Sequence, residues 1–578
     1  MDTQSKKLSI KLTKQIEFEE PNIPKYNEKQ SLSVILTNDL LTKNYFLDDN
    51  IDYDITKHHD DLKYENLIKT WKNRDHITNS NQQFFWGSAT SCFQIEGSFK
   101  EGNRQKSIWD DFGITTEDIK NDDSAAIACN SFNQFKDDRD LLLNMNCNSS
   151  RISLAWTRII SYDKYLKPSI NMDGITHYKK VLIDLKKNGI EPFVTLFHWD
   201  TPQVLEDAYG GWNCQNKEII KDFVFYADTC FKYFGHLVKH WFTFNETQTY
   251  AVDGVEFNWF APAIGNSDGI STDGREYLCA HNQILAHAYA VDSYRNNFFD
   301  QNGKIGMVCN CDGSLPFDKH SKKDRDAADR NFEFWFCWFY DPFFFGEYPK
   351  IMRDLVGDRL PEFTTEEKEL VQGSIDFIAW NTYTLKFFQY TKFSDSQQGW
   401  VYDQQSTALT VNSEGKSNGL PTQSSWLQIT PYAPAITLNR MIERYGIEGK
   451  KGIQLKLKNG SYKELSLFIT EFGMDVLDQD KSTTYDVCKK DYERIFYYDS
   501  YFKNISKGIK ETGITLEGIF PWSLEDNYEW ASKYGCRFGL NYVDFLTKCK
   551  KDPKYRQRLP KFSAIWYKEY IKNHPNGL

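Results

Sequence analysis

The sequence predicts an α/β fold: a (β/α)8 TIM barrel with long βα loops, preceded by a polar N-terminal extension. Eight short apolar runs, rich in β-branched and aromatic residues, recur along the chain, and long stretches with helical signals separate them. Near-continuous apolar strands that alternate with amphipathic helices are typical of a parallel sheet covered by helices. Eight such units match the number that closes a (β/α)8 barrel.

The first 80 residues differ in composition from the rest. They are rich in Lys, Asp, Asn and Glu, and only residues 32–36 resemble a strand. Such a segment buries too little apolar surface to fold alone. We therefore expect an extension over 1–80, flexible or docked as an arm, and a barrel over 81–578.

The predicted strands follow one another from residue 84 onward. They cover 84–90, 149–156, 191–199, 239–246, 304–309, 375–383, 465–471 and 516–523. Helical periodicity lies between them, best seen where apolar residues recur at three- and four-residue spacing and Gly235 follows as a stop. The residues of that helix face are Phe223, Tyr226, Ala227, Cys230, Phe231 and Phe234.

Composition excludes several classes of protein. The net charge of −10 gives a nucleic-acid partner no electrostatic support, and no apolar run approaches the ~20 residues of a membrane span. The twelve cysteines include no Cys-x-x-Cys pair, and the N-terminus lacks the apolar segment of a secretory signal. We expect a soluble, reduced, cytoplasmic protein. No metal-ligand spacing is present, and the chemistry inferred below needs no cofactor.

Two carboxylates end predicted strands. Glu246 ends the fourth strand and Glu471 the seventh. In a (β/α)8 barrel the carboxyl ends of all strands meet at one rim, where active sites lie. Cleavage of a glycosidic bond needs two carboxyl groups across a sugar, one protonated as an acid and the other ionised as a nucleophile or base.

Other polar and aromatic residues crowd the same predicted rim. Gln94 follows the first strand, Arg151 lies in the second, His198 ends the third, and Asn381 and Tyr383 end the sixth. Amide and carboxylate groups bind sugar hydroxyls, indole rings stack on a pyranose, and an Arg and a Tyr keep a nucleophilic carboxylate ionised and positioned.

The chain resembles the family 1 glycoside hydrolases, the β-glucosidase family, over residues 85–567. The resemblance depends on an ordered series of motifs. They are 86–90 (WGSAT), 94–97 (QIEG), 107–110 (SIWD), 198–202 (HWDTP), 210–212 (GGW), 243–246 (TFNE), 281–283 (HNQ), 286–288 (AHA), 341–342 (DP), 346–349 (GEYP), 381–383 (NTY), 469–471 (ITE), 522–530 (WSLEDNYEW), 537–540 (RFGL) and 558–561 (RLPK).

The resemblance implies retaining hydrolysis of β-glycosides, with Glu246 as acid/base and Glu471 as nucleophile. It implies a carboxyl separation of ~5–5.5 Å, a raised pKa for Glu246 and an ionised Glu471. It also implies that a group of polar and aromatic residues binds the non-reducing sugar, that the aglycone rests on Trp426, and that Arg151 and Asn381 support the nucleophile. The sugar-binding group comprises Gln94, His198, Asn245, Tyr383, Trp522, Glu529, Trp530 and Phe538.

The chain departs from the family pattern in three places. Thr247 follows the acid/base where the family usually has Pro, and we expect a modest effect because the carboxylate is unchanged. Phe472 follows the nucleophile where the family usually has Asn, and it cannot supply the amide's hydrogen bonds. The Lys-rich segment 449–460 is expected to form an exposed β-hairpin near the aglycone entrance.

These residues predict an exo-acting β-glucosidase with some tolerance for galactose or fucose. Glu529 suits a sugar whose 4- and 6-hydroxyls are free, since the 6-phospho-sugar branch of the family lacks that carboxylate. The thioglucosidase branch carries Gln at the position of Glu246, which argues against thioglucosides as substrates. Two alternatives stay open: a transglycosidase using the same intermediate, and a non-catalytic carbohydrate-binding relative, for which Phe472 is the single argument. Asn245-Glu246-Thr247 also forms a glycosylation sequon at the catalytic rim, which favours synthesis in the cytosol.

Overall fold

A computed structural model describes residues 84–114, 123–265, 273–394 and 396–578. The extension predicted for 1–80 lies outside the described residues. Within the described part of the chain, no helix is long and apolar enough to cross a membrane.

Eight parallel strands form the central sheet, and each coincides with a predicted strand. In spatial order they are β1 (Phe85–Trp86), β17 (Leu516–Ile519), β16 (Leu467–Glu471), β9 (Ile378–Asn381), β7 (Lys304–Asn310), β6 (His240–Asn245), β5 (Glu191–Phe197) and β2 (Ser149–Ser153). Beyond β1, the backbone closes on β2, because Arg151 N donates to Ser88 O at 3.0 Å and Thr90 N donates to Arg151 O at 2.9 Å. The sheet is therefore a barrel.

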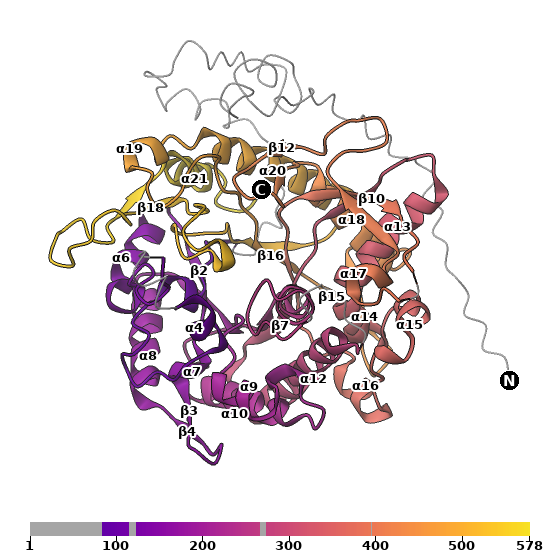
Figure 1. Cartoon of the computed structure of the whole chain (residues 1–578), viewed down its shortest axis with the longest axis horizontal. Helices are drawn as coiled ribbons and strands as arrows, with labels where there is room; N and C mark the ends of the chain where they lie inside the picture. The colour runs from indigo at the N-terminus through magenta and orange to yellow at the C-terminus, as the bar shows by residue number, and fades with distance from the viewer. Residues whose placement is uncertain (1–83, 115–122, 266–272, 395) are drawn as a thin grey trace, which may run out of the picture.

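Helices form a ring outside the strands (Figure 1). The longer ones are α6 (Ser131–Asn144), α8 (Met172–Lys187), α10 (Glu218–Phe234), α12 (Arg275–Asn297), α13 (Lys322–Phe332), α14 (Trp338–Phe345), α18 (Ala433–Tyr445), α20 (Tyr492–Thr512) and α21 (Phe562–Asn573). Helix α10 confirms the periodicity seen in the sequence: all six predicted apolar positions are buried, and Gly235 caps its end. Amphipathic helices of this kind bury one face on the sheet and leave the other in water.

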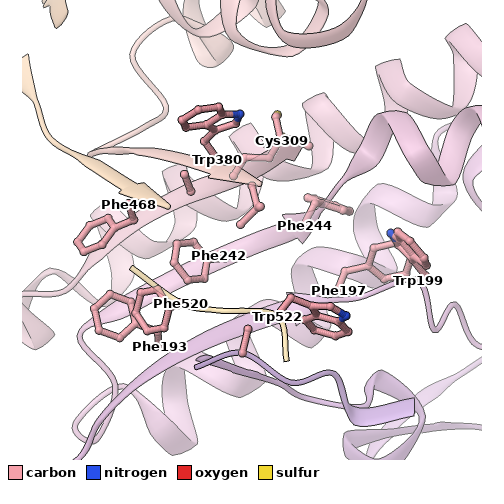
Figure 2. Packing of buried hydrophobic residues seen from close by; sticks show 14 of the residues in the cluster. Phe193, Phe197, Trp199, Phe242, Phe244, Cys309, Trp380, Phe468, Phe520 and Trp522 are labelled. Atoms are coloured by element: carbon pink, nitrogen blue, oxygen red, sulfur yellow. The ribbon is translucent and has the colours of Figure 1, made fainter. Parts of the chain in front are cut away.

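Aromatic rings fill the inside of the barrel (Figure 2). The ring of Phe193 lies 4.9 Å from that of Phe520 and 5.3 Å from that of Phe468, and all three side chains are fully buried. Phe520 fits only because position 87 is glycine, where a Cβ atom would lie 2.6 Å from its ring. The barrel is thus a packed core rather than a channel, and any site must lie at a rim.

The predicted Lys-rich hairpin exists, formed by β14 (Ile453–Lys456) and β15 (Tyr462–Leu465), which pair antiparallel. Its predicted location near the aglycone entrance is wrong. Strand β15 leads directly into the start of β16, and Lys463 Nζ lies 3.3 Å from Asp376 Oδ1, just ahead of β9. A hairpin joined to the beginning of a barrel strand stays at that end, opposite the rim that carries Glu246 and Glu471.

Candidate active site

A pocket of about 600 Å³ opens at the rim formed by the carboxyl ends of the strands. Glu246 directly follows β6 and Glu471 is the last residue of β16, so both carboxylates reach it. Ten residues predicted from the sequence line this pocket: His198, Asn245, Glu246, Tyr383, Trp426, Glu471, Trp522, Glu529, Trp530 and Phe538. The other three, Gln94, Arg151 and Asn381, are fully buried and contact the lining residues directly.

Glu471 is held by a cation and a phenol. Arg151, which points from β2, forms an ion pair with Oε1 of Glu471, and the Arg151 side chain is 1% exposed. Tyr383 Oη donates to the other carboxylate oxygen at 2.7 Å. A buried Arg and a hydroxyl donor both favour the ionised carboxylate, which is the form a nucleophile needs.

Glu246 has neutral partners instead. Asn381 Nδ2 donates to its Oε1 at 2.7 Å, and Thr249 Oγ1 donates to its Oε2 at 3.0 Å. Burial, followed by the nearby charge of Glu471, raises the pKa of Glu246 to about 8. Its backbone is left-handed, with φ of 49°, which is uncommon outside glycine and ends the strand at this residue. Because its pKa is about 8, Glu246 is protonated at neutral pH.

Two asparagines connect the carboxylates. Asn245 Oδ1 accepts from Arg151 Nη2 at 2.6 Å and from Asn381 Nδ2 at 3.2 Å. Because that oxygen is occupied, the Asn245 amide nitrogen faces His198 Nε2, at 3.1 Å. Burial, and then the charge of Arg151, lowers the pKa of His198, so its ring is neutral and accepts this bond. One network thus sets the positions of both acids.

The closed end of the pocket carries Glu529 and Trp530. Gln94 Nε2 donates to Tyr528 O at 2.9 Å and lies 3.4 Å from Glu529 Oε2. Burial, with Asp475 as the next cause, raises the pKa of Glu529 to about 8. The Trp530 ring packs 4.5 Å from the Trp199 ring. An acidic group beside indole faces in a nearly closed pocket suits a sugar ring with free hydroxyls.

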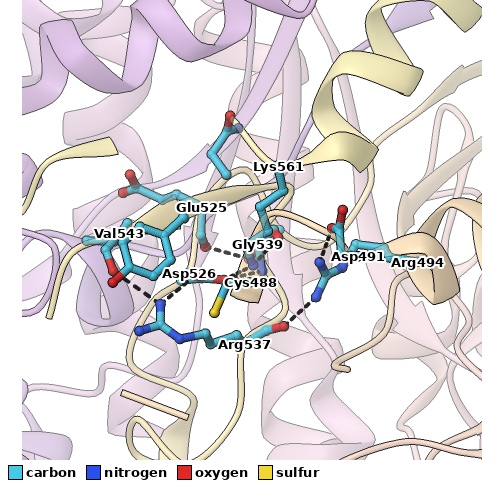
Figure 3. Close-up of polar contacts among 12 residues, drawn as sticks. Cys488, Asp491, Arg494, Glu525, Asp526, Arg537, Gly539, Val543 and Lys561 are labelled. Carbon is cyan, nitrogen blue, oxygen red and sulfur yellow. Dashed lines mark hydrogen bonds and ion pairs between the residues drawn. The ribbon is translucent and has the colours of Figure 1, made fainter. Parts of the chain in front are cut away.

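A buried ion network holds the loop that carries these residues (Figure 3). Asp526 accepts from Arg537 Nη1 and from Lys561 Nζ, both at 2.6 Å, and from Gly539 N at 3.1 Å. Although burial acts to raise it, the charges of Lys561 and Arg537 hold the pKa of Asp526 below its ordinary value. Asp526, Arg537, Gly539 and Lys561 all lie within the family motifs, but their contacts with one another were not predicted from the sequence.

The outer part of the pocket is aromatic. Trp426 is 47% exposed and lies parallel to Phe538, with ring centroids 6.5 Å apart. Further lining residues that were not predicted come from the segments after β6 and β7 and from the segment before β11 (Ser406–Leu409), among them Asp253, Phe257, Trp259, Trp335 and Trp400. The dense aromatic runs at 257–260 and 332–340 were the signals that could have indicated them.

The residues that depart from the family pattern lie outside the pocket lining. The Phe472 side chain is fully buried and packs on α20, 5.2 Å from Tyr498 and 5.6 Å from Phe502 between ring centroids. Its carbonyl accepts from Trp522 N at 2.8 Å, so the main chain after the nucleophile still positions that tryptophan. Thr247 is buried at the start of the short helix α11 (Thr247–Thr249).

Comparison with known proteins agrees with this geometry. The sequence pattern of glycosyl hydrolase family 1 matches residues 78–576. The chain is 36% identical over 499 residues to β-glucosidase 42 of Arabidopsis thaliana, covering 86% of this chain and 95% of that protein. The crystal structure of rice Os3BGlu6 β-glucosidase superposes with a TM-score of 0.75 at 36% identity, covering 84% of this chain and 97% of the other. A β-glucosidase from the fungus Humicola insolens in complex with glucose gives a TM-score of 0.75 at 35% identity, over 85% and 98% of the two chains. The chain belongs to glycosyl hydrolase family 1.

Proposed function

We propose that this protein is a retaining, exo-acting β-glucosidase that releases terminal β-D-glucose, with Glu246 as acid/base and Glu471 as nucleophile. One observation carries the proposal: two carboxyl groups face one pocket, where Arg151 and Tyr383 contact Glu471, while burial and the charge of Glu471 raise the pKa of Glu246 to about 8. The β-glucosidases named above support glucose as the sugar.

In the first step, Glu246 transfers its proton to the glycosidic oxygen. A carboxylate oxygen of Glu471 forms a bond to the anomeric carbon as the bond to the aglycone breaks. The aglycone leaves as a neutral alcohol, Glu246 becomes a carboxylate, and glucose stays attached to Glu471 as an ester.

In the second step, Glu246 removes a proton from water, whose oxygen attacks the anomeric carbon and displaces Glu471. Two displacements on one carbon retain its configuration. The change of role has a physical cause. Once Glu471 is an ester, its charge no longer raises the pKa of Glu246, so the ionised form needed for the second step becomes easier to form.

The closed end of the pocket binds the glucose. Glu529 and Trp530 take the hydroxyls farthest from the reacting carbon, with Gln94 behind Glu529, and His198 and Asn245 take those near it. Trp522 and Phe538 supply apolar faces, and Tyr383 touches both the sugar and the nucleophile. Because this end is closed, one terminal sugar enters at a time.

The alternatives differ in how the intermediate ends. A transglycosidase would resolve the same ester with an alcohol in place of water. A non-catalytic relative is not favoured, because both carboxylates are in place and Phe472, the one residue that argued for it, packs away from the pocket.

The test is hydrolysis of a panel of p-nitrophenyl β-glycosides by wild type and by Glu471→Ala, with the first-formed anomer identified by NMR. We expect β-glucoside to be cleaved with β-glucose released first, and Glu471→Ala to lose activity at least 10⁴-fold. Wild-type inactivity across the panel would transfer support to the binding alternative. Glycosylated alcohols formed on adding methanol would measure transglycosylation.

Cytoplasmic synthesis is part of the proposal. Asn245 is 1% exposed and both atoms of its amide group are hydrogen-bonded, so a glycan attached to this sequon would prevent the site from forming. Mass spectrometry of the protein from its native source should find Asn245 unmodified, and a glycan there would overturn this part.

A further inference from the structure

Asp253 is a carboxylate in the pocket wall that the proposed hydrolysis does not use. It lies in the π-helix η4 (Tyr250–Glu256) and lines the pocket together with Thr249 and Val252. Burial raises the pKa of Asp253 to about 7, and among the described residues no hydrogen bond or ion pair reaches its carboxylate. The pocket therefore contains an acceptor whose partner has to come from a ligand.

The position of Asp253 places it on the leaving-group side. Thr249 donates to the Glu246 carboxylate, and Asp253 follows four residues later in the same helical segment and lines the same pocket. The acid protonates the oxygen that joins glucose to the aglycone, and the glucose occupies the closed end near Glu529. Trp259 N donates to Asp253 O at 2.8 Å, and the Trp259 side chain is 60% exposed, so Asp253 lies on the open side of the pocket, where the aglycone extends from the glycosidic oxygen.

Aromatic side chains line the same pocket as this carboxylate. Phe257 and Trp259 stack with ring centroids 4.5 Å apart, and Trp335 meets Trp400 edge-on at 5.3 Å. Trp259 is 60% exposed, which places an indole face at the mouth of the pocket. Aromatic faces attract cations through their quadrupoles, and a carboxylate among them adds a full charge.

The other charged residues of the pocket also favour a cationic ligand over an anionic one. Among the residues that the structure describes, those lining the pocket include no lysine or arginine. Asp312, a second acid in the lining, already has one oxygen engaged, because its Oδ1 accepts from the backbone nitrogens of Tyr383 at 2.7 Å and Thr384 at 3.0 Å. Asp253 is thus the acid in the aglycone half that remains available.

We propose that Asp253 is a specificity-determining residue that selects β-glucosides whose aromatic aglycone carries an ammonium group. This inference rests on the proposed β-glucosidase function and names its substrate class. The aromatic walls hold the ring, and the Asp253 carboxylate pairs with the ammonium group.

The experiment compares kcat/KM for three glucosides that differ in the charge of the para substituent. They are 4-(aminomethyl)phenyl β-D-glucoside as the cation, 4-ethylphenyl β-D-glucoside as the neutral analogue of the same size, and 4-(carboxymethyl)phenyl β-D-glucoside as the anion. The enzymes are wild type, Asp253→Asn and, as a matched control, Asp137→Asn, which removes the same charge from an exposed position on α6.

We expect the cation-to-neutral ratio of kcat/KM to fall about tenfold in Asp253→Asn, the size of a partly screened charge pair. The anion-to-neutral ratio should rise, and both ratios should keep their wild-type values in Asp137→Asn. A ratio cancels any loss of folded enzyme. Equal ratios in wild type and Asp253→Asn would overturn the inference.

The two proposals fail separately. Hydrolysis of all three glucosides without a change of ratio defeats only the role of Asp253, whereas hydrolysis of none defeats the proposed function. In that second case, calorimetric binding of the same glucosides to Glu471→Ala and to Glu471→Ala with Asp253→Asn still decides the selectivity. A tenfold loss of affinity confined to the cation supports it, and unchanged affinity refutes it.

Discussion

Replacing Glu246 by Gln should abolish hydrolysis and at the same time stabilise the protein at alkaline pH. The amide keeps the shape of the carboxyl group: its oxygen can still accept from Asn381, and its nitrogen can donate to the hydroxyl of Thr249. What the variant lacks is the proton that Glu246 must either hold or lose.

The size of this stabilisation follows from the pKa of Glu246, which burial and the charge of Glu471 raise from 4.5 to about 8. Between these pH values the folded chain keeps the proton and the unfolded chain has lost it. The wild-type free energy of unfolding therefore falls as pH rises, by about 1.4 kcal/mol per unit. The full effect is up to about 5 kcal/mol above pH 8 and is absent below pH 4.5.

The assay is urea unfolding of wild type and Glu246→Gln between pH 5 and 8.5, followed by tryptophan fluorescence. The quantity of interest is the difference between their unfolding free energies, in which the other titrating groups cancel. Glu369→Gln, the same change at an exposed position of α16 (Thr365–Val371), is the control and should show no trend with pH. A difference for Glu246→Gln that does not change with pH would refute the reasoning.

Three further predictions concern the site. For a glucoside with a poor leaving group, kcat/KM should fall about tenfold per pH unit above pH ~8, because Glu246 loses the proton it donates; a fall that begins below pH 6 would contradict this pKa. Tyr383→Phe should lower kcat/KM about 10–100-fold by removing the hydrogen bond to Glu471, with little change in melting temperature; steady-state kinetics that show equal activity would exclude this role. Phe472→Ala should destabilise the fold by about 3–5 kcal/mol in urea unfolding while the pH profile of the remaining activity keeps its shape, since the ring packs on α20 and not in the pocket; a shifted profile without loss of stability would contradict this.

Local pattern was enough to predict the strands and the position of the two acids. The eight strands are short apolar runs, and burial on both faces of a parallel sheet demands such runs, so each one was visible in the sequence. Because all parallel strands end at the same rim, the residues ending them could be placed together without coordinates. Glu246 and Glu471 do meet in one pocket, with Arg151 and Tyr383 beside the second acid.

Contacts between distant segments were not predictable in this way. Nothing near Phe472 in the sequence indicates that its ring packs on α20, and the same holds for the bonds of Asp526 to Arg537 and Lys561. The Lys-rich hairpin was predicted correctly as a hairpin, because antiparallel pairing across a short turn is local. The end of the barrel at which the hairpin lies was predicted wrongly, because its location depends on how β15 joins β16.

The sequence by itself determined the barrel, the residues that end its strands at one rim, and the chemistry of the paired carboxylates. These follow from side-chain periodicity and residue type. The family resemblance implied which acid is protonated, but the tertiary structure alone shows what raises the pKa of Glu246 and that Asp253 lines the pocket. The pKa of Glu246 depends on burial and on a charge 225 positions along the chain, and the availability of Asp253 depends on every neighbour that could have paired with it. Both are sums over contacts in space, and folding brings those contacts together from many separate segments.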